Sequence, residues 1–169
     1  MRKAKQKRFN NKKIGLTPRE LDVLRKLDTP QKIQDFVSAI PQNFELCGDS
    51  CMSVRETLKK CRAHCIEGAL TAALAFWIHG GRPLLMDLKT KDDDDHVVAI
   101  FKQNCHWGAI SKTNHAILRY RDPIYRTLRE LAMSYMHEYS NADWKKSLCS
   151  YSRPLDLSTY KPEAWVTGK

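Results

Sequence analysis

The most apolar stretch of the chain runs from His64 to Trp77 and reads HCIEGALTAALAFW. Its length and its many small residues predict a buried helix that begins near Cys65 and ends at Gly80-Gly81. The apolar part covers only residues 65–79 and contains Glu67, so it is too short for a membrane span. We therefore expect one long helix at the centre of the fold, with a cysteine at its N-terminus.

The chain after this helix is predicted to form an antiparallel sheet. Short β-branched and apolar runs indicate strands over residues 84–88, 96–101, 107–111 and 115–120, with a hairpin turn at residues 103–105. The second of these strands begins at His96. We expect Asp122, which precedes Pro123, to cap a last helix whose apolar residues extend from Leu128 to Met136.

Three shorter helices are predicted before the long one. Thr17-Pro18-Arg19-Glu20 and Ser53-Val54-Arg55-Glu56 read as capping boxes, and Thr29-Pro30 opens another helix. Helices followed by an antiparallel sheet indicate the α+β class. We expect a basic disordered tail at residues 1–13, a single domain at residues 14–140, and an aromatic arm at residues 141–169 that packs on the domain.

Composition and charge limit the classes of molecule that this chain is expected to bind. The net charge is +10, but seven lysines and arginines lie in residues 1–13, so the body is only weakly basic. No base-reading motif or aromatic platform accompanies the tail, and we expect no specific nucleic-acid partner and no membrane partner. Without a secretory signal, the six cysteines are expected to be free thiols in the cytoplasm. The sequence does not indicate the oligomeric state.

Cys65 and His96 are the residues with the clearest chemical potential. A helix N-terminus favours negative charge and lowers the pKa of a thiol, which makes it a better nucleophile near neutral pH. An imidazole on a following strand is a suitable base. Each residue also has a purely structural alternative, since cysteine is often a core residue and a strand histidine can be half-exposed without a role.

The order of these elements resembles the transglutaminase-like superfamily, in particular its bacterial members. The match rests on Cys65 at the start of the core helix, His96 on a strand, and Trp107 opening the return strand, and it covers roughly residues 40–125. The resemblance implies a transglutaminase-like or papain-like core and a cysteine-dependent hydrolase or acyl transferase. Its substrate would be a protein or peptide amide, without a cofactor or metal.

The superfamily usually orients its histidine with an aspartate beyond that tryptophan, and this chain has none on the strand. Residues 111–114 are expected opposite His96, but one residue of register reverses which side chains face it. We select Asn114, because an amide can accept from the imidazole as in papain-like sites. Ser111 is the alternative.

Two hypotheses from other functional classes remain. The chain could be a catalytically inactive transglutaminase-like binding module. It could also be a cysteine-rich zinc-binding domain, because Cys47-x3-Cys51 and Cys61-x3-Cys65 form a paired pattern. The four aspartates at residues 92–95 lack the alternating spacing of a calcium site. His64 is expected to face away from Cys65, because adjacent residues diverge on a helix.

Overall fold

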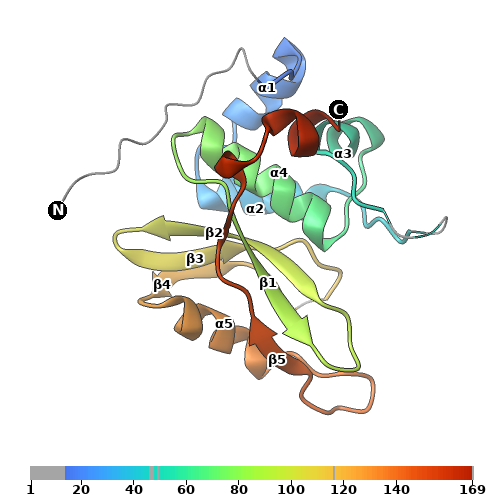
Figure 1. Cartoon of the computed structure of the whole chain (residues 1–169), viewed down its shortest axis with the longest axis vertical. Coiled ribbons are helices and arrows are strands. Elements are labelled where there is room, and N and C mark those ends of the chain that lie inside the picture. The colour runs from blue at the N-terminus through green and yellow to red at the C-terminus, as the bar shows by residue number, and fades with distance from the viewer. Residues whose placement is uncertain (1–13, 46–47, 49, 116, 169) are drawn as a thin grey trace.

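A computed structural model describes residues 14–45, 48, 50–115 and 117–168. The basic tail predicted at residues 1–13 and the cysteine at position 47 lie outside these ranges. The described chain is of the α+β class, with helices and an antiparallel sheet (Figure 1). Its helices are α1 (Pro18–Arg25), α2 (Pro30–Ala39), α3 (Val54–Lys60), α4 (Cys65–Ile78) and α5 (Leu128–Met136).

The N-terminal helices begin where the sequence predicts. The Thr17 hydroxyl accepts from the Glu20 N–H, and the Glu20 carboxylate accepts from the Thr17 N–H, which completes the capping box of α1. Thr29 and Ser53 occupy the same N-cap position at the starts of α2 and α3. Such caps join residues three apart in the chain, so they form without any tertiary contact.

The sheet has the strand order β4-β3-β2-β1-β5, and β6 also pairs with β1. All of these pairs are antiparallel. The strands are β1 (Leu84–Thr90), β2 (His96–Gln103), β3 (His106–Ile110), β4 (Arg121–Tyr125), β5 (Leu148–Tyr151) and β6 (Leu155–Asp156).

The β2–β3 hairpin turns on two residues, Asn104 and Cys105, which both have positive φ. Two such residues match a type I′ turn, whose twist suits a tight hairpin. The turn fixes the register at Ala99 opposite Ile110. This register later decides which side chain after β3 can reach His96.

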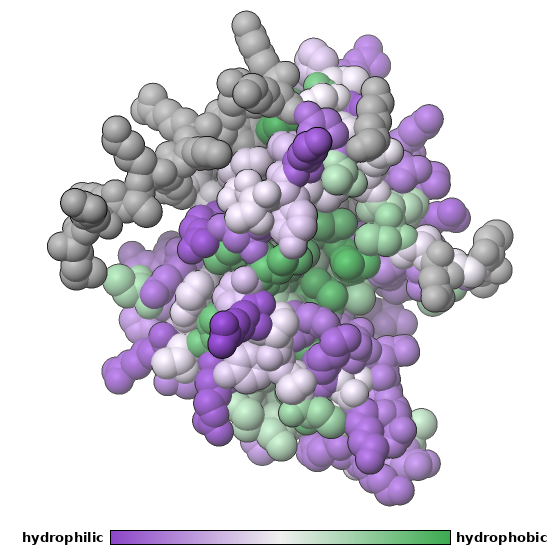
Figure 2. Space-filling model, in the orientation of Figure 1, coloured by the Kyte–Doolittle hydropathy of each residue, from purple (hydrophilic) through white to green (hydrophobic). Residues whose placement is uncertain are grey.

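Two layers of helix cover the sheet. Figure 1 shows α1 to α4 on one side of it and α5 on the other. One hydrophobic cluster joins α4 to Leu85, Ala99 and Phe101, and a second joins α5 to Val98 and Ile100. Figure 2 shows hydrophobic residues gathered in the middle of one face, over the seam between α4 and the sheet, with mostly hydrophilic residues around them.

Two predictions between β3 and α5 are wrong. The fourth strand is Arg121–Tyr125 instead of residues 115–120, which form bends and irregular chain in their described part. Asp122 and Pro123 therefore lie inside an edge strand, where a proline is tolerated because its missing N–H faces no partner. The cap of α5 is Thr127, whose hydroxyl accepts from the Glu130 N–H.

The C-terminal arm adds secondary structure that has no periodicity in the sequence. β5 and β6 pair with β1, and a 3-10 turn (Leu157–Thr159) and a short π-helix (Glu163–Thr167) follow. In Figure 1 the arm returns from the sheet to end beside α3 and α4. There the buried Trp165 stacks on Trp77, with ring centroids 5.8 Å apart. None of the helices in the described ranges is long and apolar enough to cross a lipid bilayer.

Candidate thiol–imidazole site

Cys65 is the first residue of α4 and is partly buried. Its N–H belongs to the first turn of the helix, where backbone N–H groups have no carbonyl partner within the helix. These groups and the helix dipole favour an anion at this position. The structure thus places the predicted nucleophile where its thiolate form is electrostatically supported.

The pKa of Cys65 is lowered from 9.0 to about 6. Burial by itself raises this pKa, but hydrogen bonds from the side chains of His64 and His96 and from the Val97 N–H outweigh it, together with the charge of His96. Each of these groups stabilises the thiolate and not the neutral thiol. The thiolate is therefore the favoured form of Cys65 at neutral pH.

His96 opens β2 and is held from its far side by a hydroxyl. Nε2 of His96 lies 2.6 Å from the Ser111 Oγ, and that hydroxyl donates to the Leu118 carbonyl. Since the hydroxyl proton is used in this bond, Ser111 accepts from an Nε2–H of His96. This leaves Nδ1 of His96 for proton exchange with the thiol.

Ser111, rather than Asn114, contacts the His96 ring. With Ala99 opposite Ile110, strand alternation places Ser111, the first residue after β3, on the face of the hairpin that carries His96. Ser111 is 1% exposed. Asn114 is exposed and lies on the wall of the pocket described below. The register, which the sequence left open, thus favours the alternative residue.

The backbone of Ser111 is fixed by Gln34, a buried residue of α2. The Gln34 amide donates to the Ser111 carbonyl at 2.8 Å and accepts from the Ser111 N–H at 3.0 Å. This pairing imitates a strand partner at the point where β3 ends. Sequence reasoning missed Gln34, because nothing in the periodicity of α2 distinguishes a polar residue that pairs with a strand from one that faces water.

The prediction that His64 faces away from Cys65 is wrong. His64 is the N-cap of α4, with φ −102° and ψ −166°, so it lies outside the helical geometry on which the prediction relied. Its Nδ1 lies 3.9 Å from the Cys65 Sγ. Its Nε2 lies 2.7 Å from the Ser50 carbonyl oxygen and 3.2 Å from the Glu45 Oε1.

Both ring nitrogens of His64 therefore face acceptors, which favours the doubly protonated imidazolium. The pKa of His64 is raised from 6.5 to about 9. The hydrogen bond to Cys65 is the largest cause; burial opposes it, and the Ser50 carbonyl and the charge of Glu67 add to it. Cys65 and His64 consequently form a thiolate–imidazolium pair between pH values of about 6 and 9.

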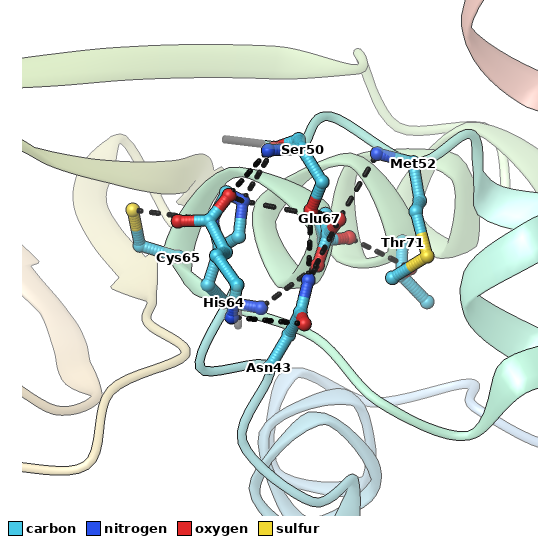
Figure 3. A network of polar contacts seen from close by, with 8 residues as sticks. Asn43, Ser50, Met52, His64, Cys65, Glu67 and Thr71 are labelled. Carbon is cyan, nitrogen blue, oxygen red and sulfur yellow. Dashed lines mark hydrogen bonds and ion pairs between the residues drawn. The ribbon is translucent and has the colours of Figure 1, made fainter. Parts of the chain in front are cut away.

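Glu67, which is fully buried, ties the α4 N-terminus to the preceding loop (Figure 3). Its carboxylate accepts from the His64 N–H at 2.9 Å, the Met52 N–H at 3.0 Å and the Asn43 amide at 3.2 Å. A buried carboxylate is tolerated only when donors surround it in this way. The network holds His64 in place, and the spacing of His64 and Glu67 at the helix start is the sequence signal that could have revealed it.

A pocket of about 470 Å³ opens beside the thiol. Its wall is formed by the loop after α2, the start of α4, the β1–β2 loop with the start of β2, the segment after β3 and the segment that follows α5. Cys65, His64 and His96 all line it. Its volume lies within the range of pockets that take small molecules or a few residues of a peptide.

The zinc reading finds no support among the described residues. They contain no cluster of three or more histidine, cysteine or acidic side chains that could hold a metal ion. The described cysteines are all free.

In comparisons with known proteins, the chain matches no family model and no curated protein.

Proposed function

We propose that this chain is a cysteine-dependent enzyme of the transglutaminase-like type, which cleaves or transfers the acyl group of an amide. The observation that carries the proposal is the Cys65 thiol, whose pKa is lowered to about 6 between two imidazoles at the edge of a pocket. A structural cysteine needs neither an ionised sulfur nor a pocket, whereas a nucleophile needs both.

The reaction would begin with attack of the Cys65 thiolate on the carbonyl carbon of the substrate. The oxyanion that forms would lie near the N–H groups of the first turn of α4. His96 would donate a proton from Nδ1 to the leaving nitrogen as the C–N bond breaks, leaving a thioester on Cys65. Water or a primary amine would then release the acyl group, and His96 would take up the proton of the attacking nucleophile.

The two histidines have different parts in this scheme. His64 is the cation of the pair at neutral pH, because its Nδ1 faces the Cys65 sulfur and its Nε2 faces the Ser50 carbonyl and the Glu45 carboxylate. It stabilises the thiolate before attack. His96 is the residue that exchanges protons, because Ser111 holds its Nε2 and orients its free nitrogen. A free thiolate nucleophile requires a reducing compartment, so the cytoplasm remains the proposed location.

An acyl-enzyme trap tests the function without knowledge of the natural substrate. Incubation with p-nitrophenyl acetate should produce a burst of p-nitrophenol and one acetyl group on Cys65, detected by mass spectrometry of the intact chain and its peptides. The acylation rate should rise with an apparent pKa near 6, as the thiolate forms.

Cys65→Ser should abolish the burst, and His96→Ala should slow it. Cys61→Ser is the matched control, because Cys61 is an exposed thiol outside the pocket. If acetylation occurs equally on exposed cysteines, or if no burst appears in folded protein, the enzyme reading fails and the inactive binding module takes its place.

A further inference from the structure

Lys112 is a buried lysine that the proposed mechanism does not use. It follows Ser111 directly after β3, and it is only 5% exposed. Its side chain crosses α4 at Gly68, where an added Cβ would overlap the Cβ and Cγ of the lysine. The missing side chain at Gly68 thus lets the lysine stem lie against the core helix, one turn from Cys65.

The ammonium group of Lys112 has few partners. It donates to the carbonyl of Ile40, at the C-terminus of α2, at 2.7 Å. In the described part of the chain, this is its sole hydrogen bond, and no carboxylate lies within ion-pair distance of it. Burial lowers the pKa of Lys112, and the charge of Arg119 lowers it further. An ammonium has three N–H donors, so two remain available.

The same lysine lines the pocket that holds Cys65 and His96. Four of the five acidic residues that line the pocket have side-chain partners: Glu45 has His64, Asp95 has Lys89, Glu138 has Arg121, and Asp93 has the hydroxyl of Ser147; the fifth, Asp94, is exposed to solvent. Among the described charged residues that line the pocket, Lys112 is therefore the one that is buried and has no oppositely charged partner. A buried and uncompensated charge is costly unless a ligand supplies its partner.

We propose that Lys112 binds a carboxylate of the acyl substrate, so that the site prefers amides that carry a carboxylate close to the bond being cleaved. This inference rests on the proposed function and names its substrate class. The carboxylate could be the C-terminus of a peptide or the side chain of an aspartate or glutamate. Both present the same two oxygens to the ammonium group.

Two alkylating reagents test the charge preference independently of any enzymatic activity. Iodoacetate and iodoacetamide have nearly the same shape, but only iodoacetate carries a carboxylate. The ratio of their rates at Cys65, measured by mass spectrometry at low salt, reports how strongly the pocket attracts an anion. Lys112→Met should lower this ratio by about fivefold or more, as expected for one unit charge in contact with a carboxylate at about 4 Å, even at the dielectric constant of water.

Lys112→Arg keeps the charge and should retain most of the ratio. Lys102→Met is the matched control: it removes one charge near the far end of β2, over the Trp107 ring, and should leave the ratio unchanged. Circular dichroism checks that each variant is folded, and Lys112→Gln replaces Lys112→Met if the latter does not fold. An unchanged ratio in folded Lys112→Met or Lys112→Gln would overturn the proposal and leave Lys112 as a cap of α2.

Short peptides then separate the two sources of the carboxylate. Peptides with a free C-terminus are compared with their amidated forms, and peptides with glutamate beside the scissile bond with those that carry glutamine. The preferred source should lose its advantage in Lys112→Met. Absence of any cleavage would count against the proposed function alone, because the alkylation ratio does not depend on turnover.

Discussion

Replacement of His64 by glutamine tests the electrostatics of the thiol most directly. The pKa of Cys65 lies about three units below its ordinary value of 9.0 because hydrogen bonds from two imidazoles and one N–H outweigh burial. His64→Gln removes the hydrogen bond that contributes most to this lowering, together with the positive charge of the His64 imidazolium. We expect the pKa of Cys65 to rise by about one to two units, the usual effect of one nearby cation or charged donor.

The assay must follow the pH midpoint of alkylation, since the rate at one pH is misleading. A thiolate of higher pKa is intrinsically more nucleophilic, with a Brønsted slope of about 0.4 to 0.5. For a rise of about 1.5 units this gain is roughly fivefold, and it nearly cancels the loss of thiolate at pH 7. Iodoacetamide labelling of Cys65 from pH 5 to 10 should instead show the midpoint move from about 6 toward 7 to 8.

His106→Gln is the matched control, because that imidazole lies at the β2–β3 turn, beside the Asn104 carbonyl, and does not line the pocket. Its midpoint should equal that of the unmodified chain. A midpoint that stays near 6 in folded His64→Gln would refute the role given to His64 and assign the whole effect to His96. A midpoint near 9 in the unmodified chain would refute the thiolate itself.

Three other substitutions have defined outcomes. Ser111→Ala should slow acylation by p-nitrophenyl acetate about tenfold or more, because the imidazole loses its orienting acceptor, while Asn114→Ala should change the rate less than twofold; equal effects would contradict the role of the hydroxyl. Glu67→Gln should lower the free energy of unfolding in urea by about 2 to 3 kcal/mol, because an amide places N–H groups against donors in a buried site. Gly68→Ala should cost about 1 to 3 kcal/mol in the same assay by displacing Lys112, and wild-type stability there would show that the stem moves freely.

Local interactions allowed much of the fold to be predicted from the sequence. The caps at Thr17, Thr29 and Ser53 join residues three apart, and the long helix begins at Cys65 as its apolar run predicts. The hairpin after His96 follows from a run of β-branched and apolar residues and a short turn. The C-terminal strands were not predicted, because β5 and β6 have few buried residues and depend on pairing with β1.

The sequence by itself determined that a cysteine begins the central helix and that a histidine begins a strand, because each depends on periodicity over neighbouring residues. Only the tertiary structure decided what surrounds them. One residue of hairpin register selected Ser111 over Asn114, and the extended backbone of the N-cap turned His64 toward the thiol. The close approach of Gly68 brought Lys112 to the same pocket. Side-chain direction at strand ends and helix caps depends on contacts between distant segments, and no local pattern encodes it.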